Sequence, residues 1–215
     1  MVILVDVGMP DWMEDSSIKQ ELQLQLPNTD IFCAGQGVQD IAIEMVIIAD
    51  WRDEILEIAP NLKLIQKLGT GVDTIMASPA VTQNVRVARL ATDSQAQEMA
   101  LYCLTHVLDD LIGLSEYRSN ALGKIWRTQA PRRPEDTNIA ILGIGHIGRA
   151  AAKLFNSLNF RVSGWSKTSK ELTNINCLIG EDGLKRALQN ADVIILALPS
   201  TELTKKLINM EVFLQ

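Results

Sequence analysis

Residues 139–148 read Ile139-Ala140-Ile141-Leu142-Gly143-Ile144-Gly145-His146-Ile147-Gly148. Four apolar residues, a G-x-G-x-x-G pattern and then an amphipathic stretch predict a strand, a tight turn and a helix. In such a turn Gly143 would permit the bend, Gly145 would let a pyrophosphate approach the backbone, and Gly148 would let the helix pack closely on the strand. Free N–H groups at the helix start attract phosphate. The stretch therefore predicts a dinucleotide-binding βαβ unit; the alternative is a glycine-rich turn without a ligand.

The end of the next predicted strand, residues 160–165, distinguishes the two nicotinamide cofactors. NAD-binding sites place an acidic residue there, about 20 residues after the turn, to bind the ribose 2′-hydroxyl. This chain has Ser166, Lys167 and Thr168 at that point and no acid. Hydroxyl groups and an ammonium suit a 2′-phosphate, which a carboxylate would repel. We therefore expect NADP(H) in preference to NAD(H); in the alternative, Lys167 only solvates the strand end.

The chain has two histidines, and neither is expected to be catalytic. His146 lies inside the glycine turn, where its ring would face cofactor phosphate or solvent instead of a substrate carbon. His106 lies on the polar face of a long predicted helix, so we expect a surface residue. Two distant histidines without a cysteine cluster also argue against a zinc site.

Upstream of this region, strands and helices alternate. Five short β-rich runs span residues 2–7, 31–34, 45–49, 62–68 and 85–90, and helical patterns span residues 12–26 and 52–59. This alternation predicts an α/β fold with a parallel sheet covered on both faces. Several of the runs are continuously apolar, as strands buried on both faces should be.

A long amphipathic helix is expected between the two regions. Apolar residues recur at i, i+3 and i+4 spacing over residues 96–112, and Asp93 or Ser94 can cap the helix start. A polar, proline-containing connector over residues 123–138 leads back to alternating elements. In that part we expect strands beginning near Ile139, Phe160 and Asp192, a short helix over residues 183–189 and the start of a helix after Leu203.

Composition excludes several classes of protein. Of 215 residues, 47% are hydrophobic and 21% are charged, so the chain can bury a core and is not disordered. Lys and Arg total 20 against 26 Asp and Glu, and the net charge of −6 disfavours nucleic-acid binding because it repels phosphate backbones. No run of about 18 uncharged apolar residues is present, which argues against a membrane span.

The N-terminus and the cysteines indicate the compartment. The first residues predict a buried strand and no signal peptide, because they lack a basic lead and reach Asp6 early. Cys33, Cys103 and Cys177 are scattered and odd in number, which suits core thiols in a reducing environment. We therefore expect a cytoplasmic protein.

A second glycine turn, Gly69-Thr70-Gly71, follows the strand expected over residues 62–68. Consecutive N–H groups in such a turn can hold an anion, and loops at the carboxyl ends of strands hold ligands in α/β sheets. A carboxylate on a small substrate would fit. From composition alone, an ordinary left-handed turn is the favoured alternative.

Three motifs together resemble one family. Residues 68–73, 143–149 and 198–209 occur in the order and spacing of the D-isomer-specific 2-hydroxyacid dehydrogenases, and the resemblance runs from Met1 to Gln215. Residues 71–75, Trp126 and residues 165–168 look most similar to glyoxylate/hydroxypyruvate reductases of the A type, which use NADPH. A formate-type dehydrogenase shares the glycines and is an alternative.

The resemblance implies a flavodoxin-like substrate domain over residues 1–92 and a Rossmann NAD(P)-binding domain over residues 93–215. The reaction would be reduction of a small 2-keto acid to the D-2-hydroxy acid by NAD(P)H, in a homodimer formed with the long helix. The substrate carboxylate would lie on Gly69, Thr70 and Gly71. The implied cofactor-binding residues are Gly143, Gly145, His146, Ile147, Gly148, Ser166, Lys167, Thr168, Leu198, Pro199 and Ser200.

The resemblance carries no catalytic residue into this chain. In the family, the catalytic Arg, Glu and His all follow the segment that resembles residues 198–209. We therefore expect a C-terminally truncated chain that lacks the return helix of its first domain, ends its second domain after the third strand, and is inactive alone. The alternative is a non-catalytic protein that binds nucleotide and dimerises.

Overall fold

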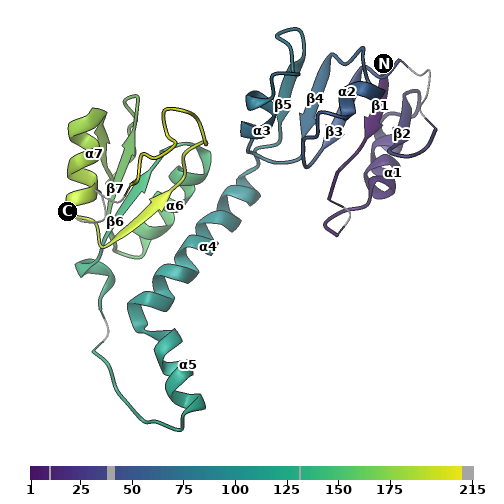
Figure 1. Cartoon of the computed structure of the whole chain (residues 1–215). Helices are drawn as coiled ribbons and strands as arrows, with labels where there is room; N and C mark the ends of the chain where they lie inside the picture. The colour runs from purple at the N-terminus through teal and green to yellow at the C-terminus, as the bar shows by residue number, and fades with distance from the viewer. Residues whose placement is uncertain (10, 38–41, 131, 210–215) are drawn as a thin grey trace. The chain divides into compact units, whose positions relative to one another are not determined.

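A computed structural model describes residues 1–9, 11–37, 42–130 and 132–209. The chain divides into two compact units, Met1–Ala91 and Thr92–Gln215 (Figure 1). Each unit is built on its own parallel sheet. The predicted parallel α/β architecture is therefore confirmed.

The first unit contains a five-stranded parallel sheet in the order β2-β1-β3-β4-β5. Its strands are β1 (Val2–Val5), β2 (Asp30–Cys33), β3 (Met45–Ile48), β4 (Leu64–Lys67) and β5 (Arg86–Arg89), and its helices are α1 (Asp15–Gln25), α2 (Ile55–Ile58) and α3 (Asp73–Ala77). Separate apolar clusters cover the two faces. Because β2 and β3 lie on opposite sides of β1, the direction of winding reverses there, as in flavodoxin-like folds.

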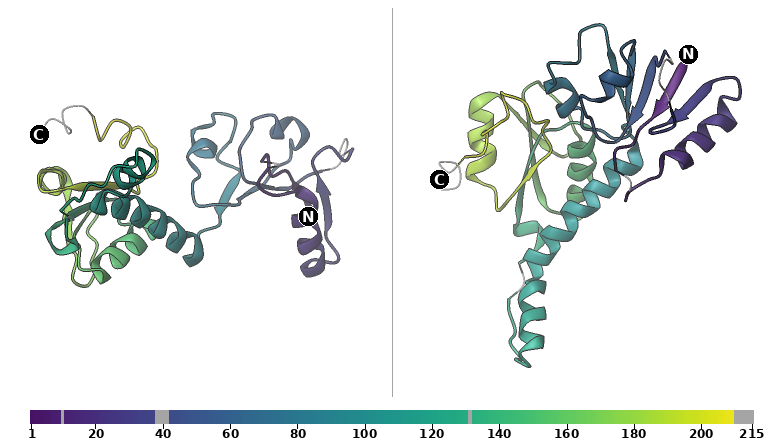
Figure 2. Two further views of the ribbon diagram at one scale, coloured as in Figure 1. Left: turned by 90° about the horizontal axis from the view of Figure 1, so that it is seen from below. Right: turned by 45° about the vertical axis from the view of Figure 1, so that its right-hand side comes forward.

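The second unit contains a four-stranded parallel sheet in the order β8-β7-β6-β9. Its elements are α4 (Asp93–Ile112), α5 (Leu114–Leu122), a 3-10 turn η1 (Pro134–Asp136), β6 (Asn138–Leu142), α6 (His146–Ser157), β7 (Arg161–Ser166), β8 (Asn176–Ile179), α7 (Gly180–Gln189) and β9 (Val193–Leu196). Apolar residues of α4 and α6 pack on one face of the sheet, around Phe155, and α7 packs on the other. Figure 2 shows α4 running on into α5.

The structure corrects three expectations about the second unit and adds a helix, α5, after the long one. The expectation of three strands in this unit is wrong, because β8 is a fourth strand between β7 and β9 in the sequence. Thr92 caps α4, since its side chain accepts a hydrogen bond from the Gln95 N–H, and Asp93 is already helical. Gly113 interrupts the helix in a left-handed conformation, with φ of 67°, and α5 continues beyond it. Residues 202–206 form a turn, and no helix begins between Leu203 and Asn209.

Candidate functional site

The glycine turn lies at the carboxyl end of β6, and its first glycine has no substitute. Gly143 has a φ of 105°, a conformation that L side chains rarely adopt. Its N–H donates a 2.8 Å hydrogen bond to the Trp165 carbonyl, which ties the turn to β7. A Cβ atom at Gly143 would lie 2.4 Å from the carbonyl oxygen of Ala197, the residue after β9, so this backbone also excludes a side chain here. The expected role in the bend is thus what the structure shows.

The other two glycines have opposite surroundings. A Cβ atom at Gly148 would lie 1.9 Å from the Gly143 carbonyl oxygen, so only glycine lets α6 pack this closely on the turn. A Cβ atom at Gly145 would meet nothing within 4 Å, so its backbone is open to a ligand. Gly145 also caps α6 without a side-chain hydrogen bond, which leaves N–H groups of the first turn available to an anion. This cradle fits a pyrophosphate.

His146 is anchored to the start of α4. Its Nε2 atom lies 3.0 Å from the Thr92 carbonyl oxygen and 3.5 Å from Asp93 Oδ1, and 39% of its side chain is exposed. The ring therefore has a protein partner, whereas phosphate or solvent was expected. Its backbone and that of the half-buried Ile147 form the first turn of α6.

Two other segments are expected to contact the cofactor. Both follow strands of this sheet and begin at the same side of it as the glycine turn. Register pairs Leu142, just before the turn, with Trp165 on β7 and with Leu196 on β9. Because the strands are parallel, the segments that follow them begin side by side, namely Ser166-Lys167-Thr168 after β7 and Leu198-Pro199-Ser200 after β9.

The side chains in these segments differ in their contacts. The Ser166 hydroxyl donates to the Thr168 carbonyl over 2.6 Å, whereas Lys167 is exposed and makes no ion pair within the described part of the chain. Leu198 Cδ2 would lie 3.0 Å from a Cβ atom at Gly143, so this segment borders the turn directly. Leu198, Pro199 and Ser200 all line a cavity of about 250 Å³.

In the first unit, the Gly69-Thr70-Gly71 turn follows β4. Neither glycine has a positive φ, so the left-handed turn considered from composition does not form. The Arg89 guanidinium donates a 3.0 Å hydrogen bond to the Thr70 carbonyl, and Lys67 Nζ would lie 3.9 Å from a Cβ atom at Gly69. Two cations that sequence reasoning missed therefore flank the turn. Their signal in the sequence was that each lies near the end of a predicted strand, over residues 62–68 and 85–90, and the structure pairs the two residues in register.

Sequence reasoning also missed a buried carboxylate at the end of β1. Asp6 is 6% exposed and forms an ion pair with Arg52, which follows β3. Desolvation raises the pKa of Asp6, the Arg52 charge opposes that effect, and the Asp15 charge adds to it. The pair lines a cavity of about 450 Å³ at the point where the winding of the sheet reverses.

Other predicted features fall outside these sites. His106 is exposed and meets the Tyr102 ring edge-on, with 4.6 Å between centroids. Cys33, Cys103 and Cys177 are free thiols. No group of His, Cys, Asp and Glu among the described residues could hold a metal ion. None of the described helices combines the length and hydropathy that a membrane span requires.

Residues 104–215 match a family described as D-isomer specific 2-hydroxyacid dehydrogenase, NAD binding domain. The chain is 27% identical over 199 residues to a glyoxylate/hydroxypyruvate reductase A of Yersinia enterocolitica, covering 90% of this chain and 63% of that protein. It is 29% identical over 201 residues to the enzyme of that name from Photorhabdus laumondii, covering 91% and 64%. A crystal structure of a D-isomer specific 2-hydroxyacid dehydrogenase from Xanthobacter autotrophicus Py2, in complex with NADPH and MES, is 27% identical with a TM-score of 0.87, covering 99% of this chain and 68% of that one. The chain spans less than two thirds of the length of the two reductases.

Proposed function

Since the chain belongs to the D-isomer specific 2-hydroxyacid dehydrogenase family, we propose that it serves the NADPH-dependent reduction of a small 2-keto acid, of the glyoxylate or hydroxypyruvate type, to the D-2-hydroxy acid. The observation that carries this proposal is the glycine turn, where an open Gly145 and uncapped N–H groups of α6 leave room for a pyrophosphate. When bound, the cofactor would supply the hydride.

In this proposal each segment at the carboxyl edge has a binding role. The first turn of α6, with Gly143, Gly145, His146, Ile147 and Gly148, holds the pyrophosphate. Ser166, Lys167 and Thr168 hold the 2′-phosphate, and Leu198, Pro199 and Ser200 border the nicotinamide end. The assignment of Lys167 rests on its exposed ammonium and on the absence of an acid beside it in the sequence.

The substrate carboxylate is assigned to Gly69, Thr70 and Gly71 in the first unit. Lys67 and Arg89 support this assignment because they place two positive charges beside the turn. An anion there is stabilised by these charges in addition to backbone N–H groups.

Residues 1–215 supply binding groups for this reaction and no histidine acid. Reduction of a ketone needs a proton donor beside the developing alkoxide. The sequence has two histidines, of which His106 is exposed on α4 and His146 is anchored to Thr92. We therefore propose that the 215-residue chain binds cofactor without turnover, which is also what the non-catalytic alternative requires.

A cofactor titration tests the proposal. The 215-residue chain should bind NADPH more tightly than NADH, and should not oxidise NADPH when glyoxylate is added. Lys167→Glu should weaken NADPH binding about tenfold, because a charge-assisted hydrogen bond is replaced by repulsion of the 2′-phosphate. NADH affinity should change little, and fluorescence titration of both cofactors measures the two values.

Lys185→Glu is the matched control, because Lys185 is an exposed lysine on α7 and the charge change is the same. Equal losses in the two variants would show a general electrostatic effect and would remove Lys167 from the site. Absence of NADPH binding to the unmodified chain would contradict the proposed function itself.

We also propose that the chain is cytoplasmic, since its three cysteines are free.

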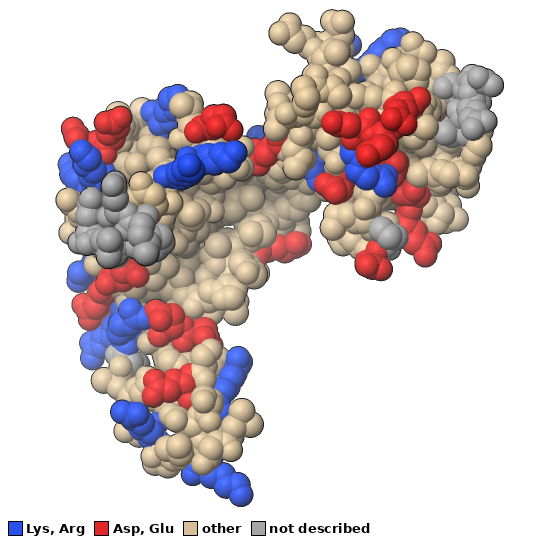
Figure 3. Space-filling model, in the orientation of Figure 1, with Lys and Arg blue, Asp and Glu red and all other residues tan. Residues whose placement is uncertain are grey.

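A further proposal is that the chain forms a homodimer through the α4–α5 helices and the segment after them. Leu122 is 89% exposed and Trp126 94% exposed, and further apolar side chains of α4 are exposed as well. Figure 3 shows charged residues of both signs around uncharged surface at the α5 end. An apolar centre with a polar rim is typical of protein interfaces.

Replacing Leu122 and Trp126 by serine should therefore shift the protein from dimer to monomer. Loss of a large aromatic anchor at an interface raises the dissociation constant about 30-fold or more. Sedimentation equilibrium over a range of concentrations measures this constant. Trp12→Ser, which removes an exposed tryptophan of the first unit, should leave it unchanged; a monomeric unmodified chain would refute the dimer.

A further inference from the structure

Polar side chains replace apolar ones on part of one face of the second sheet. Register pairs Asn138 with Arg161, and Ser163 with Asn176, on adjacent parallel strands. Farther along the same strands this face is apolar and packs on α7. Strands of a parallel sheet are normally apolar on both faces, because both faces are covered. Here Arg161 and Asn176 are exposed and Asn138 and Ser163 are half-buried, so this polar half of the face is open to solvent and to a polar ligand.

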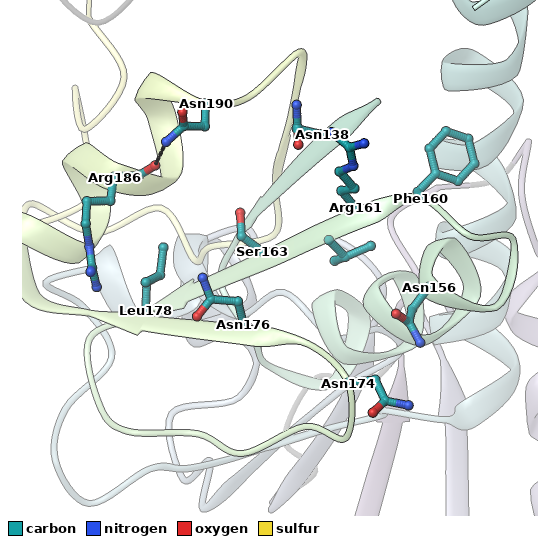
Figure 4. A pocket seen from close by; sticks show the side chains of 11 residues that line it. Asn138, Asn156, Phe160, Arg161, Ser163, Asn174, Asn176, Leu178, Arg186 and Asn190 are labelled. Carbon is teal, nitrogen blue, oxygen red and sulfur yellow. Dashed lines mark hydrogen bonds between the residues drawn. The ribbon is translucent and has the colours of Figure 1, made fainter. Parts of the chain in front are cut away.

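These four residues line a cavity of about 500 Å³ at the amino ends of β6, β7 and β8. Figure 4 shows Ser163 and Asn176 on neighbouring strands and Arg186 extending from α7 toward the sheet. Within the described part of the chain, the side chains of Ser163, Asn176 and Arg186 make no hydrogen bond or ion pair with protein. Three polar side chains with unused capacity thus face one cavity.

Two aspartates next to the cavity already have partners. Asp136 Oδ1 lies 3.5 Å from the Arg161 guanidinium. Asp192 Oδ2 accepts hydrogen bonds from the Asn138 N–H, over 2.7 Å, and from the Asn138 side-chain amide, over 3.0 Å. Arg186 is therefore the lining guanidinium without a carboxylate among the described residues. A guanidinium beside a hydroxyl and an amide is a donor set for an oxyanion.

We propose that this cavity binds a small phosphate monoester, with Arg186, Ser163 and Asn176 as its phosphate ligands. The donors come from two strands and a helix instead of one plane, which fits a tetrahedral group with three terminal oxygens better than a flat carboxylate. Small-molecule sites typically enclose roughly 300–1,000 Å³, so this cavity has room for an organic group beside the phosphate.

The proposed site is separate from the proposed cofactor site. Asn138, Arg161 and Asn176 begin their strands, whereas the glycine turn follows the end of β6. Because all of these strands are parallel, one site lies at the amino ends of the strands and the other at their carboxyl ends. A ligand in the cavity should therefore bind together with a nicotinamide cofactor, whether or not the chain is a reductase.

Amide NMR of the 215-residue chain, titrated with inorganic phosphate and with glycerol 3-phosphate, tests the proposal. Both probes should shift the signals of Ser163 and Asn176, with the monoester binding more tightly, and the shifts should persist at saturating NADP⁺. Arg186→Gln should weaken both probes about tenfold, because a charge-assisted pair is lost. Ser163→Ala should weaken them less, since it removes a neutral donor.

Lys185→Gln is the control, because it removes the same charge from the neighbouring position of α7, which does not line the cavity. Equal binding by the unmodified chain and Arg186→Gln would overturn the site. Shifts confined to residues 143–148 and lost with NADP⁺ would also overturn it, because the phosphate would then occupy the glycine turn. Acetate binding as tightly as phosphate would overturn the choice of a tetrahedral ligand.

Discussion

Gly148→Ala should destabilise the second unit by about 3 kcal/mol and remove its affinity for a nicotinamide cofactor. A Cβ atom there would lie 1.9 Å from the Gly143 carbonyl oxygen, which belongs to the backbone of a turn that β7 and β9 hold in place. The strain cannot be relieved by rotating a side chain, so α6 must move away from β6. Hydrogen exchange of the β6 amides measures this loss, because it reports on the second unit separately from the first.

Gly145→Ala separates the fold from the ligand in the same turn. A Cβ atom at Gly145 meets no atom within 4 Å, so the β6 amides should retain their protection to within about 1 kcal/mol. Cofactor affinity should nevertheless fall, because the methyl group occupies the space assigned to the pyrophosphate. Unchanged affinity in Gly145→Ala would show that the phosphates lie elsewhere, and unchanged exchange in Gly148→Ala would contradict the packing argument.

Arg52→Ala should destabilise the first unit by about 2 kcal/mol at neutral pH. The change leaves the carboxyl group of Asp6, whose side chain is 9% exposed, without its charged partner. The expected loss is smaller than for a fully buried pair, since 47% of the Arg52 side chain is exposed and solvent screens the attraction. Hydrogen exchange of the β1 amides measures it. Arg86→Ala is the control, because Arg86 is exposed and has no ion pair in the described part of the chain.

The pH dependence of the same variants gives an independent test. Burial raises the pKa of Asp6 above its ordinary value of 3.8, so the folded state binds this proton more tightly than the unfolded state. The stability that Asp6 contributes is therefore greatest below pH 3.8 and is lost as the pH rises through its raised pKa. Arg52→Ala should enlarge this loss, because it removes the charge that lowers the Asp6 pKa. Asp6→Asn should abolish it, and a persisting loss in Asp6→Asn would assign the effect to another group.

The strands were predictable wherever burial on both faces leaves an unbroken apolar run, as in β1, β3 and β6. β8 was not predicted, because its residues Asn176-Cys177-Leu178-Ile179 begin with a polar side chain that lines the cavity described above. Thr92, Asp93 and Ser94 all suit a helix cap, and only the geometry selects Thr92. Local sequence therefore predicts a strand well where burial on both faces requires an apolar run. It predicts a helix cap poorly where adjacent residues have equal capping propensity.

The site shows a similar division. The bend at Gly143 and the close packing at Gly148 follow from a motif within a few residues. The contact of His146 with Thr92, the pairing of Asp6 with Arg52, and the placement of Arg89 beside Thr70 each join residues distant in the chain. No local pattern carries such contacts. They depend on which strands and helices pack together, and the sequence alone leaves that arrangement open.

The order β8-β7-β6-β9 makes β9 an edge strand among the described residues, with consequences for handling the protein. Its sequence, Val193-Ile194-Ile195-Leu196, has no charge and no proline, and Leu196 is 58% exposed. Edge strands of natural proteins usually carry a charged residue or a proline. Without one, the open row of N–H and C=O groups can pair with the strand of another chain. Purification at low concentration, or a lysine substituted at Leu196, would guard against precipitation through this strand.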